Sequence, residues 1–504
     1  MMDGQPPFLE MRGITKAFGG VLANDHIDFD VQPGEVHALL GENGAGKTTL
    51  MEILYGLYTA DAGDIFVEGK HVHIHSPLDA MHLGIGMVHQ HFMLIPVFSV
   101  CENIVLGMPG RHDLRRAAEE IRELSQRFGL EVDPQARTGG LPVGMQQRVE
   151  IVRALYRGAR LLVLDEPTAV LTPIESATLM RFVRSMASEG HSVIIITHKL
   201  EEATEASDRV TVLRRGRKVA TLPTRETDER ELSRLMVGRD LEPATSQRHD
   251  EAGPSCLTVE HLSVRGERGA LSCKDACFEV RCGEVLGVAG VSGNGQSELA
   301  EAIAGLRQPA EGRVSLLGVD VTGWGPRALM HAGMAHVPED RKATGCVGAF
   351  NLVENLILGR HRESSFAQRG LVLRRRAIRD FGERTVQEFD IRAAGLDTAI
   401  SVLSGGNVQK LILARELQRN PKLLVAVEPT RGLDVGAIEY VHRTILGLCD
   451  QGVAVLLFSS DLSEVFALSN RIAAMYHGRL LGPFPVAEVD TERIGYMMTR
   501  GVAA

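Results

Sequence analysis

A glycine-rich loop between a predicted strand and a predicted helix constrains the fold more than any other stretch. Residues Gly41–Thr48 fit the pattern G-x-x-x-x-G-K-[ST]. The loop follows the apolar run Val36–Leu40, which predicts a buried strand, and precedes Leu50–Leu54, which predicts the start of a helix. Glycines allow backbone N–H groups to curl inward around phosphate oxygens, and the helix N-terminus adds a positive dipole end. The stretch therefore predicts a phosphate site in which Lys47 reaches the β- and γ-phosphates and Thr48 binds Mg²⁺.

Strands alternate with helices beyond this loop. The runs Ile85–Gln90, Arg160–Glu166 and Ser192–Thr197 predict buried strands, and residues 99–157 predict mainly helix. Upstream, Phe8–Val31 alternates strand-like segments with turns. The alternation of strands and helices predicts an α/β fold with a mainly parallel sheet that is covered on its faces.

The chain repeats this pattern once, which predicts two related domains. Gly34–Val36 returns as Gly283–Val285 and Gln90 as Glu339, a shift of 249 residues. Leu141 returns as Leu403, a shift of 262 residues. The second copy therefore holds 13 extra residues between Glu339 and Leu403. This region is predicted to be helical, and an insertion there can lie on the surface.

A short polar stretch separates the two copies. Residues Arg239–Cys256 are rich in Pro, Ser, Asp and Glu, which predicts a solvated linker. We expect a first domain over residues 1–240, a linker over 241–255 and a second domain over 256–504. Each domain is long enough to bury its own core.

Charge and composition exclude several classes of function. The net charge of −9 argues against nucleic acid as the main partner, because phosphate binding requires a basic face. No apolar run reaches the ~18 residues of a membrane span, and the N-terminus lacks the features of a signal peptide. We therefore expect the chain in the cytosol, with its seven cysteines reduced. Cys273, Cys277 and Cys282 have neither C-x-x-C spacing nor an obvious fourth ligand, so we expect small apolar residues rather than a metal site.

Polar residues end the predicted strands of the first copy. Asp165 and Glu166 end a strand beside the P-loop strand, where one acid can hold Mg²⁺ and another can orient or deprotonate an attacking water. Gln90 is suited to contact Mg²⁺ and that water, and His198 can hydrogen-bond a γ-phosphate. Taken singly, the acid pair also fits a solvated turn or helix cap, Gln90 a structural role, and His198 packing or the surface.

A second phosphate-binding pattern lies in the second copy. Ser404, Gly405 and Gly406 open the predicted helix that continues to Gln418. Backbone N–H groups, a hydroxyl and a helix N-terminus suit a phosphate. Taken alone, the stretch fits a simple helix N-cap formed by Ser404 better.

Together these motifs resemble the ATP-binding cassette ATPases, with two cassettes fused in one chain, and the resemblance covers nearly all of it. It implies two tandem P-loop ATPase domains, each with a RecA-like mixed sheet, an antiparallel β subdomain and a helical subdomain. It also implies ATP and Mg²⁺ as cofactors. In this family the cassettes pair head to tail, so that each ATP lies between one P-loop and the other cassette's Leu-Ser-Gly-Gly signature.

The resemblance assigns a role to each motif. Phe18 resembles the aromatic residue that stacks on adenine, and Asp165, Gln90 and Thr48 resemble the Mg²⁺-binding positions. Glu166 resembles the catalytic carboxylate, with His198 as the switch histidine and Gln90 as the Q-loop residue. The remaining expected ATP contacts are the P-loop and the second copy's signature: Gly41, Glu42, Asn43, Gly44, Ala45, Gly46, Lys47, Thr48, Thr49, Ser404, Gly405 and Gly406.

The second copy departs from the family pattern at its own nucleotide site. Where the first copy has the lysine, the first strand-end acid and the histidine, the second copy has Gln296, Val427 and Ser460. The signature of the first copy carries Pro142 in place of the serine. Under head-to-tail pairing all these losses fall on one site, so we expect one catalytic site and one that at most binds nucleotide. The carboxylate kept at Glu428 argues in the other direction.

Fused cassettes with a degenerate second copy resemble the ATPase subunits of bacterial sugar and nucleoside importers. Residues Met87–Leu94, Pro167–Pro173 and Leu235–Arg239 resemble the nucleoside branch, which works with lipoprotein-type binding proteins. The resemblance implies a peripheral subunit at the cytoplasmic face of the cell membrane, with two permease subunits, expected to differ, and an extracytoplasmic solute-binding protein as indirect partner. The alternatives are a ribose- or galactose-type sugar importer and, from another class, a cassette ATPase acting in translation. A translation ATPase would be expected to carry two competent sites and a long charged linker.

Overall fold

The computed structural model describes residues 6–90, 92–108, 110, 113–168, 171, 173–238, 253–267, 269–291 and 293–501. The chain divides into two compact units, here called the first unit (mainly residues 1–242) and the second unit (mainly residues 243–504). Most of the expected linker, residues 241–252, lies outside the described residues. Within the described part, no helix is both long and apolar enough to cross a bilayer.

A six-stranded sheet forms the centre of the first unit. Its strand order is β10-β9-β3-β8-β7-β6, and all neighbours run parallel except β10, which is antiparallel to β9. The strands β3, β7 and β8 are buried along their whole length, as expected for a parallel sheet with both faces covered. The bounds are β3 Val36–Leu40, β6 Ile85–Val88, β7 Leu161–Asp165, β8 Ser192–Thr197, β9 Arg209–Arg214 and β10 Arg217–Pro223.

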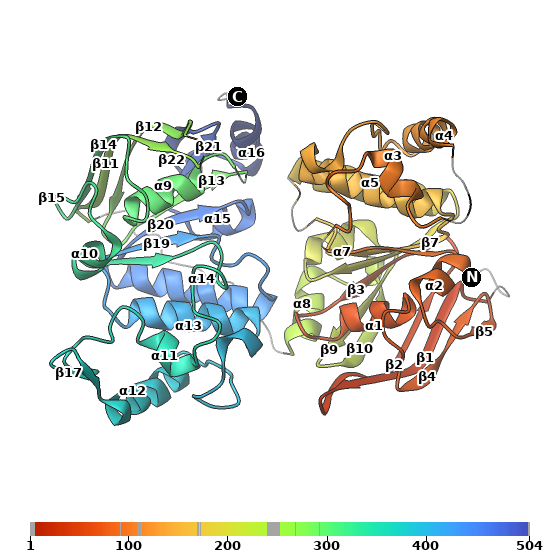
Figure 1. The fold of residues 1–504 in the computed structure, drawn as a ribbon, viewed down its shortest axis with the longest axis horizontal. Coiled ribbons are helices and arrows are strands. Elements are labelled where there is room, and N and C mark those ends of the chain that lie inside the picture. Colours follow the sequence, from red (N-terminus) through yellow and green to blue (C-terminus); the bar gives the residue numbers. More distant parts are fainter. Residues whose placement is uncertain are drawn as a thin grey trace. The chain divides into compact units, whose positions relative to one another are not determined.

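The first unit also contains an antiparallel sheet and a group of helices. The antiparallel sheet has the order β2-β1-β4-β5, with β1 Leu9–Phe18, β2 Val21–Val31, β4 Ala62–Val67 and β5 Lys70–Val72. Figure 1 shows α3, α4 and α5 together at one end of this unit and the strands β1, β2 and β4 at the other. The helices are α1 Lys47–Leu54, α2 Pro77–His82, α3 Val100–Val105, α4 Leu114–Arg127, α5 Val143–Tyr156, α6 Pro173–Ser188, α7 Leu200–Ala206 and α8 Glu229–Val237.

The second unit repeats this architecture. Its six-stranded sheet has the order β16-β19-β20-β13-β21-β22, and its antiparallel sheet the order β12-β11-β14-β15. The strands are β11 Ser255–Arg265, β12 Leu271–Arg281, β13 Val285–Gly290, β14 Glu311–Leu316, β15 Val319–Asp320, β16 Met334–Val337, β19 Leu423–Val427, β20 Ala454–Ser459, β21 Arg471–Tyr476 and β22 Arg479–Pro485. The helices are α9 Gln296–Ile303, α10 Pro326–His331, α11 Leu352–Leu356, α12 Arg375–Glu388, α13 Gly405–Leu417, α14 Val435–Asp450, α15 Leu462–Leu468 and α16 Thr491–Arg500.

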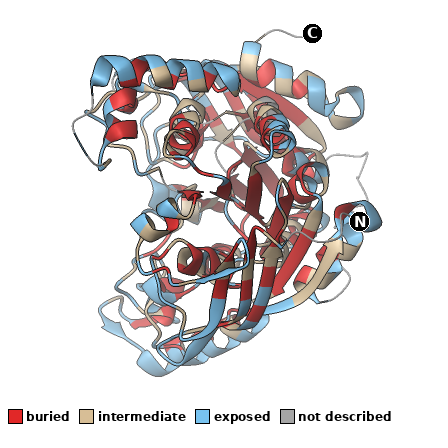
Figure 2. Ribbon diagram, turned by 90° about the vertical axis from the view of Figure 1, so that its right-hand side faces the viewer, coloured by how far each residue is buried: buried red, intermediate tan, exposed pale blue. Residues whose placement is uncertain are grey.

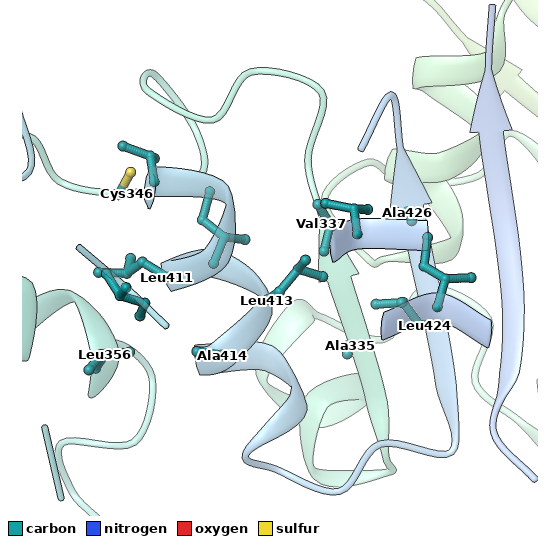
Figure 3. Close-up of a cluster of buried hydrophobic side chains, with 14 of the residues drawn as sticks. Ala335, Val337, Cys346, Leu356, Leu411, Leu413, Ala414, Leu424 and Ala426 are labelled. Carbon is teal, nitrogen blue, oxygen red and sulfur yellow. The ribbon is translucent and has the colours of Figure 1, made fainter. Parts of the chain in front are cut away.

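Each unit therefore has the mixed sheet, antiparallel β subdomain and helical subdomain that the sequence predicts, and the predicted fold class is confirmed. Buried residues concentrate in the strands of the sheets and on the inner helix faces (Figure 2). In the second unit, Leu411, Leu413 and Ala414 of α13 belong to one buried cluster with β16 and β19 (Figure 3). This packing fixes the helix that opens at Ser404 against the sheet.

The 13-residue insertion differs from the prediction in its secondary structure. The starts of α3 and α4 lie 14 residues apart, whereas the corresponding starts of α11 and α12 lie 23 residues apart. Most of the extra length therefore lies between α11 and α12, where the chain forms a two-stranded hairpin of β17 Ala367–Gln368 and β18 Val372–Leu373. The expected helix is absent at this place because Arg369 and Gly370 both adopt positive φ, of 54° and 70°, which turns the chain back on itself.

Candidate functional site

The glycine-rich loop of the first unit runs from the end of β3 to the start of α1. Gly46 is the N-cap residue of α1 and has a φ of 99°, a conformation that disfavours residues with a side chain. A Cβ atom at Gly41 would collide with the carbonyl oxygen of Leu213, and one at Gly46 with that of Ala23. These two glycines are therefore required by close backbone packing as well as by the turn.

Lys47 is the buried cation of this loop. Its side chain is only 5% exposed, and its Nζ donates to the carbonyl oxygens of Gly41 at 2.6 Å and Glu42 at 3.0 Å. Burial lowers the pKa of the Lys47 amine, while the carboxylates of Glu166 and Asp165 act in the opposite direction. The cation thus lies within the field of both strand-end acids, as the motif spacing predicts.

Asp165 ends β7 and is itself buried. Burial raises the pKa of its carboxyl to about 6, and the neighbouring charge of Glu166 adds to this, whereas Lys47 and a hydrogen bond with Thr48 act against it. A bound cation would favour the ionised form further. The hydroxyl of Thr48 and the carboxylate of Asp165 are oxygen donors of the kind that Mg²⁺ prefers, and the structure brings them together.

Glu166 lies between two side chains from other strand ends. Its Oε2 accepts a hydrogen bond from Gln90 Nε2 at 2.8 Å, and its Oε1 lies 2.9 Å from His198 Nδ1. Burial favours the neutral acid, but the His198 contact and the charges of His198 and Lys47 outweigh it, so the pKa of Glu166 is lowered. The carboxylate is therefore ionised and fixed in place, as a group that orients a water must be. With its amide nitrogen on Glu166, Gln90 has its amide oxygen left for a metal ion.

The backbone at Glu166 is unusual as well. Its φ is 46°, and its N–H donates to the carbonyl oxygen of Ile196 at 2.9 Å. Glu428, at the corresponding place in the second unit, has the same φ of 46° and donates to Phe458 in the same way at 2.8 Å. A non-glycine residue in this region is strained, so the sheet edge holds this conformation in both units.

Phe18 lies at the end of β1 and is 42% exposed. Its ring contacts that of Tyr58 edge to face, with the centroids 5.1 Å apart, and Lys16 Nζ lies 5.6 Å from its centroid. The exposed aromatic surface suits stacking on a base. Neither Tyr58 nor Lys16 was among the sequence-predicted residues. Tyr58 lies 40 positions from Phe18 in the sequence and belongs to no motif.

Asn24 is a second residue that the sequence did not indicate. Its fully buried side chain donates from Nδ2 to the carbonyl oxygen of Gly46 at 3.0 Å. It therefore positions the P-loop from β2. A lone asparagine within a strand gives no sequence signal for such a role.

The signature residues of the second unit lie at the start of α13. Ser404 occupies the N-cap position, but its side chain makes no capping hydrogen bond to the helix. Its exposed hydroxyl instead accepts a hydrogen bond from Asn407 Nδ2 at 2.9 Å. The simple capping role is therefore not how this serine is used, and its hydroxyl stays at the surface beside the N–H groups of Gly405 and Gly406.

The P-loop of the second unit has the same backbone course and different chemistry. Gly295 caps α9 with a φ of 105°, close to the 99° of Gly46. The Gln296 side chain lies buried against Gly290 and brings no charge to the loop. Ser297 Oγ donates to Glu339 Oε2 at 2.9 Å, and Glu339 also pairs with Arg431 at 2.7 Å. The hydroxyl that corresponds to Thr48 is thus bound to a carboxylate that an arginine already neutralises.

Glu428 keeps its carboxylate without the partners of Glu166. Burial raises its pKa to about 7, and it accepts a hydrogen bond from the backbone N–H of Ser460 at 2.7 Å. No histidine ring contacts it, since Ser460 replaces the histidine. Glu428 therefore lacks the glutamine and histidine side chains that hold the Glu166 carboxylate in place.

One group of side chains of the types that bind metal ions lies elsewhere in the described part of the chain. It consists of the exposed residues His261, Asp275 and Cys277 on β11 and β12. The sulfur of Cys277 accepts a hydrogen bond from the backbone N–H of His261 at 3.1 Å. Asp28 accepts from the backbone N–H of Gly13 at 2.7 Å in the corresponding bulge of the first unit, so the fold accounts for this arrangement.

The ABC transporter family matches residues 24–169 and again residues 273–431. The chain belongs to the ABC transporter family. Its two units are therefore two ABC cassettes, called the first and the second cassette from here on, and the chain is an ATP-binding ATPase of that family.

Relatives with the same two-cassette length are transport ATPases. The chain is 46% identical to the guanosine import ATP-binding protein NupO of Bacillus subtilis (strain 168), with 97% of each chain covered. It is 44% identical to the nucleoside import ATP-binding protein NupA of Lactococcus lactis subsp. cremoris (strain MG1363), with 98% of each covered. It is 45% identical to the glucose import ATP-binding protein TsgD13 of Haloferax volcanii, with 98% of this chain and 96% of the relative covered.

Among solved structures, an archaeal ribosome recycling factor, aABCE1, matches with a TM-score of 0.63 and 20% identity. The match covers 94% of this chain and 90% of that one. At this identity the likeness shows a shared two-cassette fold and nothing about function.

Proposed function

We propose that the chain is the ATP-hydrolysing subunit of a nucleoside importer and drives solute movement through a membrane permease. One observation carries the catalytic part of this proposal. The ionised Glu166 is fixed between Gln90 and His198 beside the buried Lys47, whereas the second cassette lacks every one of these partners.

Within the proposed site, Thr48, Asp165 and Gln90 hold Mg²⁺ through a hydroxyl, a carboxylate and an amide oxygen. The cation supplies charge that stabilises the phosphate oxygens when it is bound. Lys47 binds the β- and γ-phosphates, and Phe18 stacks on the adenine. Glu166 takes the proton of the attacking water or orients it, and His198 keeps the Glu166 carboxylate in place.

We further propose that the first cassette's P-loop and the second cassette's signature complete one catalytic site. Ser404, Gly405 and Gly406 offer an exposed hydroxyl, whose proton can still be donated, and a helix N-terminus to the γ-phosphate. The second P-loop, with Gln296 and the Ser297–Glu339–Arg431 contacts, would at most bind nucleotide.

The nucleoside substrate rests on likeness alone, because a transported solute does not touch this subunit. Two nucleoside import relatives and a glucose import relative are nearly equally similar, at 46%, 44% and 45% identity. The stretches Met87–Leu94, Pro167–Pro173 and Leu235–Arg239 favour the nucleoside branch. A sugar importer is the alternative within the family. The proposed partners are two permease subunits, which the chain binds at the cytoplasmic face of the membrane, and indirectly an extracytoplasmic solute-binding protein.

Uptake measured in proteoliposomes tests the substrate. The chain is co-reconstituted with the permeases and binding protein proposed as its partners, with ATP inside the vesicles. We expect ATP-dependent uptake of labelled guanosine that excess unlabelled nucleosides compete and glucose or ribose does not. Uptake of labelled glucose or ribose without uptake of labelled guanosine would assign the sugar branch instead. Co-purification with ribosomes rather than permeases would assign the translation class.

A further inference from the structure

The hairpin between α11 and α12 has the exposed composition of a membrane-binding element. Its six residues from Leu371 to Arg376 are all exposed, in the order Leu-Val-Leu-Arg-Arg-Arg. Leu371 is 87% exposed, Val372 64% and Leu373 49%. Leu371 follows the turn at Arg369 and Gly370, and Val372 and Leu373 form β18. Three adjacent exposed apolar side chains, here called the apolar tip, are unusual for a surface that has no partner.

Buried residues at the base of the hairpin hold it against α12. Phe366 and Ala367 are buried, and the Phe366 ring packs edge to face on Phe381 of α12 with centroids 4.9 Å apart. The backbone N–H of Arg374 donates to the carbonyl oxygen of Phe366 at 2.8 Å and closes the hairpin. The apolar tip is therefore held outward by the fold. Figure 1 shows β17 at the outer edge of the second unit, beside α12.

The charge around the tip is positive on both sides. Arg369 precedes it, and Arg374, Arg375 and Arg376 follow. No carboxylate of the described residues forms an ion pair with any of these four arginines. The whole chain carries a net charge of −9, so this basic cluster is a local departure from the composition.

We propose that this hairpin, residues 366–376, binds the surface of an anionic lipid bilayer directly. Leu371, Val372 and Leu373 enter the boundary between headgroups and acyl chains, and the arginines pair with the lipid phosphates around them. An apolar tip that is flanked in sequence by arginines without ion pairs among the described residues matches such a surface in both chemistry and charge. A protein groove would have to match both an apolar insertion and four cations, and the net charge of −9 argues against nucleic acid.

The first cassette supplies an internal control. α4 and α12 are corresponding helices, and α4 begins with Leu114, Arg115 and Arg116. The described residues between α3 and α4 form no hairpin. A second control lies within the second cassette, where the turn between β14 and β15 also exposes apolar side chains. Leu317 and Val319 are 47% and 54% exposed there, and Asp320 lies beside them.

Vesicle co-sedimentation of the purified full chain, without any permease, tests the proposal. We use vesicles of phosphatidylcholine alone and of phosphatidylcholine with about one third phosphatidylglycerol. The wild type should bind the anionic vesicles at least about tenfold more tightly than the neutral ones, and less tightly as salt rises. Leu371→Ser with Leu373→Ser, and separately Arg374→Gln with Arg375→Gln, should each reduce binding to anionic vesicles about tenfold.

The matched variants separate a hairpin effect from a general one. Leu317→Ser with Val319→Ser, and Arg115→Gln with Arg116→Gln, remove similar surface and charge elsewhere and should leave vesicle binding unchanged. Unchanged ATP affinity in every variant confirms that the cassettes stay folded. Equal losses in the controls, or wild-type binding to anionic vesicles in the hairpin variants, would overturn the proposal. If hairpin variants that bind vesicles like the wild type fail to co-purify with the permeases in a separate pull-down, the hairpin is assigned to a protein partner.

Discussion

At the scale of single residues, the two cassettes differ at the places where phosphate chemistry requires a charge. Lys47 donates to two carbonyl oxygens at the mouth of its loop and is buried beside two acids. Gln296 has the same backbone position and folds back on Gly290 without a charge. The difference in nucleotide affinity between the two loops should therefore come from this one position more than from the loop backbone.

Nucleotide titration of two alanine variants checks this difference. Lys47→Ala removes the charged hydrogen bonds to the phosphates and should weaken ATP binding at the strong site by about 10- to 100-fold. Gln296→Ala should change total ATP binding by less than about twofold. A larger loss for Gln296→Ala than for Lys47→Ala would contradict this prediction and place the strong site in the second cassette.

The residue-level predictions from sequence depended on motif spacing. The structure brings Asp165, Glu166, Gln90 and His198 together because each follows a buried strand of one sheet. Asn24 and Tyr58 could not be predicted, since their roles arise from packing between distant segments.

At the scale of elements, the strand that leads to the P-loop contains a buried histidine. His37 lies in β3 with no exposed surface, and its Nε2 is 2.8 Å from Thr211 Oγ1 of β9. Burial lowers its pKa to about 3, helped by Arg209 and opposed by Asp30. Glu35 also lies 3.4 Å from Nδ1, but its carboxylate is paired with Arg209 at 2.6 Å.

This histidine predicts a loss of stability as the pH falls. Unfolded His37 has a pKa near 6.5, so between pH 7 and pH 5 the unfolded chain gains a proton that the folded chain does not bind. The free energy of unfolding should fall by about 2 kcal/mol from this group alone.

Chemical denaturation of the full chain at pH 7 and pH 5 measures the effect. His37→Gln, which keeps a hydrogen bond to Thr211 and does not titrate, should show about 2 kcal/mol less pH-dependent loss than the wild type. His82→Gln changes an exposed histidine of the same cassette and should not alter the difference. An unchanged pH dependence in His37→Gln would contradict the role given to burial.

Helices and strands could be predicted where the hydrophobic pattern agreed with the neighbouring motifs. The hairpin in the insertion could not be predicted in this way. The strands β3, β7 and β8 are continuous apolar runs, which a parallel sheet requires. The hairpin β17–β18 was expected to be helical, because its short strands carry too little pattern to separate it from the helices around it.

At the scale of the whole molecule, the two cassettes offer unlike surfaces near the Q-loop positions. Gln90 is exposed and holds Glu166, whereas Glu339 is committed to Ser297 and Arg431. A symmetric pair of permease loops would meet two different chemistries there. The asymmetry therefore favours two different permease subunits, one for each cassette.

Purification of the assembled importer from cells that express all its genes checks this arrangement. We expect a complex that contains one copy each of two distinct permeases for each copy of this chain, as determined by intact-complex mass spectrometry. An active complex with a single permease type present twice would contradict the prediction.

We propose that ATP hydrolysis takes place at one site, made by Glu166 of the first cassette and Ser404 of the second. The most direct test of this proposal is the ATPase turnover of the reconstituted importer at saturating ATP, with the binding protein present. Glu166→Gln should lower turnover by about 100-fold or more, and Ser404→Arg should approach that loss by blocking the phosphate position.

Two further variants in the same assay provide the matched comparison. Glu428→Gln should change turnover by about twofold at most, because its site lacks the lysine, the aspartate and the histidine. Gly144→Arg, in the signature of the first cassette, should be milder than Ser404→Arg. Turnover reduced far more by Glu166→Gln and Ser404→Arg than by Glu428→Gln and Gly144→Arg is the predicted result. A loss in Glu428→Gln as deep as that in Glu166→Gln would contradict the one-site account.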